Sequence, residues 1–325
     1  MGGLAELLRR RIEQGGPLSV AEYMAEALGH PRFGYYMGRD PFGAKGDFTT
    51  APEISQMFGE LIGLWCAALW ESLGRPEPVN LVELGPGRGT LIADVLRAAR
   101  VVSGFVPALA LHLVETSPLL REKQRRMLAG AAPCWHDSVE GVPAGPLLVI
   151  ANEFFDALPI RQFQRAAGGW RERLVDRDGQ GFKFVLSEPL APDIGGRFAG
   201  APEGAIIETS PLGLDIAAAP EGALVEVCPL GLEIAASIGK RVARFGGGAL
   251  IVDYGHAASA IGDTLQAVKS HAFHDVLADP GEADLTAHVD FAALARAAAG
   301  AGAAVHGPLD QGAFLARLGL AARTE

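Results

Sequence analysis

The sequence predicts an α/β protein built on a Rossmann-like, doubly wound parallel sheet, with an N-terminal helical cap and an inserted antiparallel β region. Short apolar runs alternate with segments of helical periodicity over residues 79–157, which favours parallel strands joined by crossover helices. Residues 158–186 instead alternate apolar and polar side chains between turn signals, a pattern typical of antiparallel strands. The first 75 residues carry mainly helical periodicity.

The composition is that of a globular chain of 325 residues, with 49% hydrophobic and 20% charged residues. The formal net charge of −10 argues against broad binding to a phosphate backbone, so we expect no nucleic-acid partner. The three cysteines have neither CxxC nor metal-ligand spacing, which disfavours a disulfide framework. The histidines show no metal-ligand spacing either, and we predict no metal. No apolar run is long enough to span a membrane.

The N-terminal part is predicted to begin with an amphipathic helix that places Leu4, Leu7, Leu8 and Ile12 on one face. Its acidic residues and the lack of a cleavage-like apolar block argue against a transit peptide. A second helix is expected over residues 54–73. Between the two lies a long polar loop. We hypothesise that this loop is a lid over a ligand, with a helix-entry turn as the alternative; its candidate residues are Tyr35, Tyr36, Asp47, Thr49 and Thr50.

The parallel sheet is predicted from four apolar runs, and helices follow the first two. Ser117 and the proline after it have the positions of a helix N-cap and first turn. The predicted strands lie within residues 79–84, 109–114, 145–153 and 247–255, and the predicted helices begin at Thr90 and Ser117.

The domain organisation is predicted as a cap with a lid loop at 1–75, a ligand-binding domain at 76–157 and 222–325, and a β insertion at 158–221. Residues 201–218 recur as residues 219–236, with 13 of 18 positions identical. Two copies are too few for a solenoid, so we interpret them as a local tandem duplication. The second copy runs directly into a predicted strand and is expected to be the one inside the fold.

The glycine-rich turn after the first strand indicates the ligand. Glu83 ends the strand, and Gly85, Gly87 and Gly89 follow in GxGxG spacing before a helix. A dinucleotide site favours GxGxxG with free N–H groups around a pyrophosphate, whereas here Pro86 removes one N–H and Glu83 adds a negative charge. A cationic ligand suits this turn better. S-adenosylmethionine (SAM), with its sulfonium and ammonium groups, is the cofactor we predict.

Two further acids each follow a presumed strand: Glu115 follows the one at residues 109–114, and Asp137 follows a third one that precedes the run at 145–153. Glu115 is placed to accept hydrogen bonds from both ribose hydroxyl groups, and Asp137 to accept one from the adenine amino group. Each also has a structural alternative, because loop carboxylates commonly cap helices or face water.

Four ordered motifs, "GYYMGRDPFGAKGDFTTAPEISQMFGE", "ELGPGRGTL", "VETSPLLR" and "ANEFFDALPI", together resemble the MidA-like family of SAM-dependent methyltransferases. The resemblance spans residues 18–320 and implies a class I methyltransferase fold. Glu83, Gly85, Gly87, Gly89 and Glu115 match the cofactor motifs of the family. Mitochondrial members are complex I assembly factors that dimethylate an arginine, so the resemblance implies a protein substrate, with a complex I subunit as the partner considered. Departures are the duplicated unit and a chain that ends at Glu325, where relatives continue with further helices.

The loop "ANEFFDALP" follows the strand next to the predicted cofactor methyl group. An arginine nucleophile needs acceptors that orient its guanidinium group and take up a proton. We therefore predict Glu153, Asp156 and Asn152 as catalytic residues. The alternative is that Asn152 and Asp156 only cap or turn the chain while Glu153 faces water. Asp253 and Tyr254, after the late strand, are further pocket candidates.

Three other functions stay open from the sequence: methylation of a small molecule, a non-catalytic SAM-fold assembly factor, and, least favoured, a nicotinamide-dependent oxidoreductase. The abundance of alanine, glycine and arginine and the unpaired cysteines suggest a cytoplasmic bacterial protein. A homodimer is left open.

Overall fold

The computed structural model describes residues 3–41, 50–190 and 219–320, and within them the chain forms two compact units. The first, here called the parallel-sheet unit, comprises Asp40–Phe155, Ile234–Asp253 and Ala297–Glu325. The second, here called the antiparallel unit, comprises Met1–Arg39, Asp156–Glu233 and Tyr254–Arg296. The three-part domain division drawn from the sequence stays a prediction.

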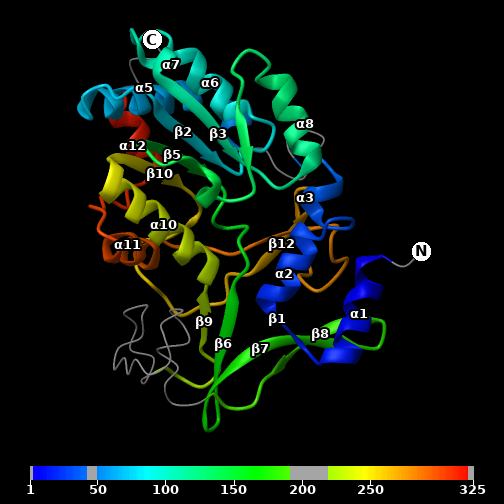
Figure 1. Ribbon diagram of the computed structural model, residues 1–325. Helices are drawn as coiled ribbons and strands as arrows, with labels where there is room; N and C mark the ends of the chain where they lie inside the picture. The colour runs from blue at the N-terminus through cyan, green and yellow to red at the C-terminus, as the bar shows by residue number, and fades with distance from the viewer. Residues whose placement is uncertain (1–2, 42–49, 191–218, 321–325) are drawn as a thin grey trace. The chain divides into compact units, whose positions relative to one another are not determined.

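The parallel-sheet unit contains a five-stranded sheet in which every neighbouring pair runs parallel. In space the strands follow the order β10-β5-β2-β3-β4, so the winding direction reverses between β2 and β5 (Figure 1). Such a reversal opens a ligand crevice beyond the carboxyl ends of the central strands. The bounds are β2 Val79–Leu84, β3 Leu109–Val114, β4 Cys134–His136, β5 Leu147–Asn152 and β10 Gly247–Val252.

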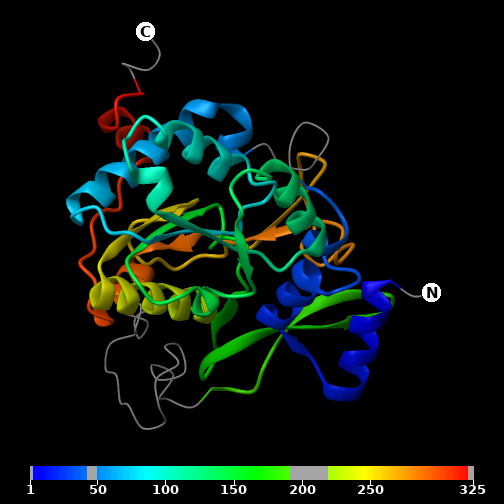
Figure 2. The ribbon, with the colours of Figure 1, turned by 45° about the horizontal axis from the view of Figure 1, so that its top comes forward.

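Helices cover both faces of this sheet, as Figure 2 shows with α5 and α6 on one side and the C-terminal part of α10 on the other. Central strands buried from both sides read as continuous apolar runs, which explains why the sequence revealed them. All six residues of β2 are buried. The helices of this unit are α4 Ala51–Ile54, α5 Gln56–Ser72, α6 Thr90–Ala99, α7 Phe105–Ala108, α8 Pro118–Met127, a 3-10 turn Val139–Gly141 and α12 Gln311–Arg317, while α10 Pro229–Phe245 and α11 Phe291–Gly300 belong to it only in part.

The antiparallel unit is organised around the order β1-β7-β6-β9, with β8 paired to β7. Its core includes Phe163, Trp170 and Val225. The strands are β1 Leu18–Ser19, β6 Arg161–Ala166, β7 Gly169–Asp178, β8 Gly181–Leu186 and β9 Leu224–Val227; shorter pairings involve β11 Gly255–His256, β12 Gln266–Lys269, β13 Ala272–His274, β14 Asp284–Thr286 and β15 Val289–Asp290. The helices are α1 Leu4–Gly15, α2 Val20–Gly29 and α3 Tyr35–Gly38.

The predicted fold class is confirmed, together with the inserted antiparallel strands. Ser117 caps α8 by accepting a hydrogen bond from the Leu120 N–H at 3.3 Å. One detail was wrong: Leu4, Leu8 and Ile12 are buried on α1, but Leu7 is exposed, because the buried stripe is narrower than predicted. The second copy of the duplication forms β9 and the start of α10, while the first copy lies outside the described residues.

The helices α5 and α6 approach each other closely because two positions on α5 lack side chains. A Cβ atom on Gly63 would lie 2.7 Å from the Val95 carbonyl oxygen, and one on Gly59 would lie 2.5 Å from the Asp94 Cβ. Both distances are too short for real atoms. The two glycines therefore set the position of α6, the helix that follows the glycine-rich turn.

We expect Gly63→Ala to lower the free energy of unfolding by about 1–3 kcal/mol, because the added methyl group must push α6 away. Urea denaturation measures this change. Gly300→Ala is the matched control in the same unit, since a Cβ there meets nothing within 4 Å. Equal stability of the two variants would contradict the role of Gly63 in helix packing.

Candidate active site

The glycine-rich turn lies at the carboxyl end of β2, the central strand of the parallel sheet. Gly85, Gly87 and Gly89 have φ angles of +60°, +53° and +86°, a region in which residues with a Cβ atom are strained. A Cβ on Gly85 would also lie 2.8 Å from the Phe154 ring. The backbone of the turn therefore strongly favours glycine at these positions, and Gly85 lies in contact with the loop that follows β5.

Glu83 is a buried acid at the end of β2, with 2% of its surface exposed. Its carboxylate accepts a hydrogen bond from the Ile92 N–H near the start of α6. Among the described residues, its Oε2 atom has no hydrogen-bond partner. Burial, together with the negative charge of Glu115, raises the pKa of Glu83 to about 8. A buried acid left partly unpaired in this way favours an incoming positive charge.

Glu115 follows β3 and is held by the protein on both carboxylate oxygens. Oε1 accepts from the Ser117 N–H at 2.8 Å, and Oε2 accepts from Gln124 Nε2 at 3.2 Å. Burial raises the pKa of Glu115, and the surrounding N–H donors oppose that rise. The predicted ribose acid is thus buried and oriented beside the turn.

Asp137 follows β4, as predicted, but its side chain is 87% exposed and pairs with Arg121 at 2.6 Å. Arg121 also donates to the Glu115 carbonyl oxygen at 2.6 Å. This arginine therefore ties the ends of β3 and β4 together. The adenine contact of Asp137 stays a prediction.

The loop after β5 brings Asn152 and Glu153 to the same edge of the sheet. Glu153 has a φ angle of +48°, which marks local backbone strain. Its carboxylate accepts from the Ala51 N–H at the start of α4, and burial raises its pKa. Asn152 Oδ1 has no hydrogen-bond partner among the described residues. The alternative in which Glu153 only faces water does not fit the hydrogen bond between its carboxylate and the Ala51 N–H.

Asp253, a pocket candidate from the sequence, holds this loop from the end of β10. Its Oδ2 atom accepts from the N–H groups of Phe154 and Phe155 at 3.1 and 2.9 Å. Phe155 is buried, whereas Phe154 contacts the glycine turn. Tyr254, the neighbouring candidate, is 66% exposed.

Asp156 belongs to the antiparallel unit, where its carbonyl oxygen accepts from the Ala287 N–H at 2.9 Å. Tyr36 of the same unit donates its hydroxyl to Asp284 at 2.8 Å. Burial, with the charges of Asp284 and Asp156, raises the pKa of Tyr36 well above its ordinary value. Tyr36 is therefore part of a polar cluster in the interior of that unit.

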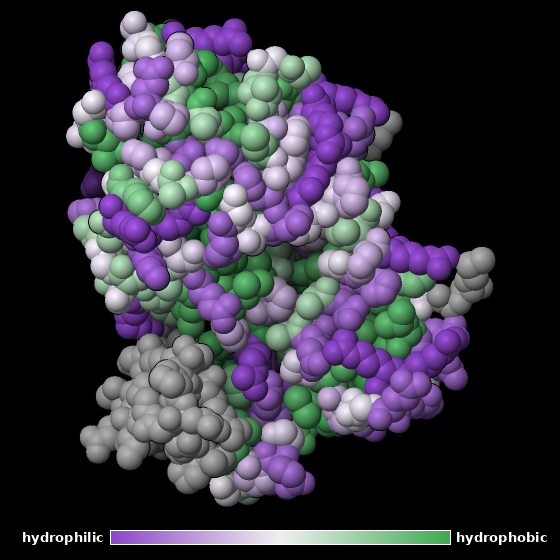
Figure 3. All heavy atoms as spheres, in the orientation of Figure 1, coloured by the Kyte–Doolittle hydropathy of each residue, from purple (hydrophilic) through white to green (hydrophobic). Residues whose placement is uncertain are grey.

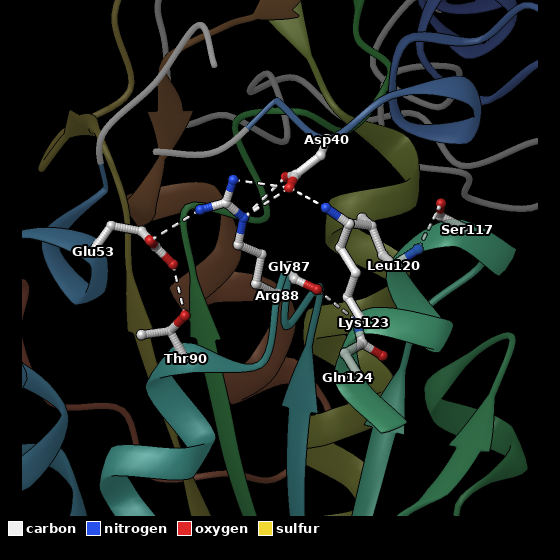
Figure 4. A network of polar contacts seen from close by, with 9 residues as sticks. All are labelled: Asp40, Glu53, Gly87, Arg88, Thr90, Ser117, Leu120, Lys123 and Gln124. Carbon is white, nitrogen blue, oxygen red and sulfur yellow. Dashed lines mark hydrogen bonds and ion pairs between the residues drawn. The ribbon is translucent and has the colours of Figure 1, made fainter. Parts of the chain in front are cut away.

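Figure 4 shows a charged network around the glycine turn that sequence reasoning missed. Arg88 pairs with Asp40 at 2.8 Å and with Glu53 at 3.3 Å. Lys123 also pairs with Asp40, and Thr90 donates to Glu53 at 2.6 Å. No sequence signal identifies this network, because its members come from four separate segments.

The lid hypothesis rests mainly on a segment that the structure does not describe. Thr49 and Asp47 lie outside the described residues. Thr50 is the residue before α4, and its side chain makes no capping hydrogen bond. The cofactor contacts of Thr49 and Thr50 stay predictions.

Comparison with known proteins identifies the family. Residues 61–309 match a family model described as "putative S-adenosyl-L-methionine-dependent methyltransferase". The chain belongs to this family. The predicted resemblance is thereby confirmed, the protein is a methyltransferase, and its cofactor is SAM.

Relatives and a solved structure support the same conclusion. The methyltransferase is 41% identical to the mitochondrial protein arginine methyltransferase NDUFAF7 homolog of Drosophila melanogaster over 100% of this chain and 76% of the relative. It is 39% identical to mitochondrial NDUFAF7 of Homo sapiens over 97% and 73%. A crystal structure of a Burkholderia thailandensis protein bound to S-adenosyl-homocysteine matches with a TM-score of 0.81 and 28% identity, covering 98% of this chain and 81% of that chain.

The expected cytoplasmic bacterial location was wrong. These curated relatives are mitochondrial proteins of eukaryotes. The prediction rested on overall composition, and richness in alanine, glycine and arginine does not specify a cellular compartment. Among the described residues, no helix is long and apolar enough to cross a membrane.

The residues at the carboxyl edge of the sheet fit SAM. Bound SAM supplies an electrophilic methyl group on a positively charged sulfur. Glu115 and Glu83, whose Oε2 has no hydrogen-bond partner among the described residues, would stabilise a cation in their ionised forms, and the three glycines of the turn permit close approach of its backbone. The protein's own part is to hold these acids and exclude water.

Ionisation of Glu83 predicts a pH dependence of stability. Its pKa is about 8 in the folded chain against an ordinary value of 4.5, so the folded state retains a proton that the unfolded state releases. The contribution to stability is full below about pH 4.5 and is lost as the pH rises through about 8, with a slope of about 1.4 kcal/mol per pH unit.

We expect the ligand-free Glu83→Gln variant to lose this slope between pH 5 and 8, because the amide does not ionise while its oxygen still accepts from Ile92. Urea denaturation at several pH values measures the slopes. Glu71→Gln, an exposed site on α5, serves as the control. Parallel curves for wild type and Glu83→Gln would rule out a protonated Glu83.

Proposed function

We propose that the protein transfers methyl groups from SAM to an arginine side chain of a partner protein. The observation that carries the proposal is the contact between the Asn152–Glu153 loop and the cofactor turn through Phe154 and Gly85. This contact supports a position close to the proposed methyl donor for the half-buried carboxylate of Glu153 and for the Asn152 amide oxygen, which has no partner among the described residues. The names of the curated relatives, which are protein arginine methyltransferases, support the same substrate.

The chemistry of arginine explains why such groups are needed. A guanidinium group is protonated at neutral pH and its lone pairs are delocalised, so it is a poor nucleophile. A carboxylate stabilises one orientation through charge-assisted hydrogen bonds and accepts the proton lost on methylation. We assign this role to Glu153, with Asn152 as a second acceptor. Asp156 follows in the same loop and is the second proposed carboxylate.

The proposed partner is a subunit of respiratory complex I, and the proposed compartment is the mitochondrion, in line with the mitochondrial relatives. The test is incubation of the methyltransferase with labelled SAM and mitochondrial extract, followed by mass spectrometry of the labelled product. Methylated arginine in a protein supports the proposal. Label only in small molecules indicates the small-molecule alternative, and absence of label despite SAM binding indicates a non-catalytic assembly factor. Light scattering of the purified methyltransferase measures its molecular mass and so tests whether it forms a homodimer.

Replacement of Glu153 by Gln tests the catalytic assignment. We expect the rate of methyl transfer to fall at least 100-fold, within the range that general acid–base groups contribute, while SAM affinity changes less than threefold. Calorimetry measures binding and label incorporation measures rate. Glu71→Gln is the matched control, since Glu71 lies on the surface and pairs only with Arg75 in the contacts described. An unchanged rate would remove Glu153 from the mechanism.

A further inference from the structure

Gln124 is a fully buried polar residue on α8, with none of its surface exposed. The outer surface of α8, at the upper right in Figure 3, is hydrophilic, so an amide on its inner side needs a specific reason. Burial of an amide is unfavourable unless its hydrogen bonds are satisfied. The bonds that Gln124 makes connect three separate parts of the cofactor edge.

The amide of Gln124 uses both kinds of hydrogen-bonding atom. Its Nε2 donates to the Gly87 carbonyl oxygen at 2.7 Å, a bond drawn in Figure 4, and to Glu115 Oε2 at 3.2 Å. Its Oε1 accepts from Trp135 Nε1 at 2.8 Å. Gln124 therefore bridges the glycine turn, the acid after β3 and the strand β4.

The orientation of this amide is determined by its partners. An indole N–H can only donate, so Oε1 must face Trp135. The two N–H bonds of Nε2 then face Gly87 and Glu115, which present only acceptors when Glu115 is ionised. A flipped amide would oppose donor to donor at Trp135 and acceptor to acceptor at Gly87. Only one orientation of the Gln124 amide therefore makes all three hydrogen bonds.

We propose that Gln124 is a positioning residue for the nucleoside half of the cofactor, and that it gives the enzyme preference for ligands with an intact ribose 2′-hydroxyl. The proposal rests on the assignment of Glu115 as the acid that accepts from the ribose. Gln124 holds one carboxylate oxygen while the Ser117 N–H holds the other. The carboxylate is thus oriented relative to the turn before the ligand arrives, which reduces the ordering cost of binding.

A purely structural role is the alternative, since a Cβ on Gly89 would lie 3.6 Å from Gln124 Cγ and the two residues pack together. Gln124→Met preserves most of this packing and removes the polar bridge. The same substitution at Gln162 is the matched control. Gln162 is also fully buried and hydrogen-bonded, but to Glu226 and Asp263 in the antiparallel unit.

The experiment measures by calorimetry the affinity of each folded variant for S-adenosylhomocysteine and for its 2′-deoxy analogue. We expect wild type to prefer the natural ligand at least tenfold, which is in the range of a hydrogen bond to a charged group. Gln124→Met is expected to weaken S-adenosylhomocysteine binding about tenfold and the 2′-deoxy analogue less than threefold. Gln162→Met is expected to retain the wild-type preference.

Equal losses for both ligands in Gln124→Met would reduce Gln124 to a packing residue and overturn the proposal. Wild type without preference between the two ligands would also overturn it, because Glu115 would then not bind the ribose, although the methyltransferase assignment would stand. Failure of wild type to bind S-adenosylhomocysteine would instead count against the cofactor itself. A Glu115→Gln background provides a second check, in which Gln124→Met is expected to cause no further loss.

Discussion

The reversal of strand order between β2 and β5 is the constraint on which the candidate active site depends. Because every strand of this sheet runs parallel, the segments that follow β2, β3, β4 and β5 all emerge at one edge. Residues that are far apart in the chain, such as Glu83 and Asn152, therefore reach the same edge. The close packing of α5 on α6, made possible by two glycines, keeps the helix after the turn in place.

Burying two acids at the carboxyl edge of the sheet lowers the stability of the ligand-free protein whenever those acids are ionised. Glu83 and Glu115 are both buried, and each pKa is raised mainly because burial disfavours the charged form. The Ile92 N–H relieves only part of this cost at Glu83. A sulfonium or ammonium group would offset it, whereas a pyrophosphate would add to it. The ionised forms of these two acids, which burial disfavours in the absence of a ligand, therefore favour a cationic cofactor over a dinucleotide.

The active edge is also held by groups that do not contact the proposed substrate. Arg121 and Gln124, one helical turn apart on α8, reach the ends of β3 and β4 and the glycine turn. Arg88 connects the turn to Asp40 and Glu53. Asp253 supports the loop after β5 through two backbone N–H groups. Such supporting bonds maintain the geometry that positioning of a methyl acceptor requires.

The sequence by itself determined the parallel strands, the glycine turn and the acids that follow the strands, because buried parallel strands are recognisable as apolar runs and because glycine adopts the positive φ angles of such a turn without strain. Only the tertiary structure decided the exposure of Asp137, the N–H contact of Glu153 with Ala51, and the partners of Arg88 and Gln124. Those features depend on which side chains meet across distant segments. The periodicity of apolar residues along a segment gives no information about such long-range contacts, since it shows only the face of a helix or strand on which a residue lies.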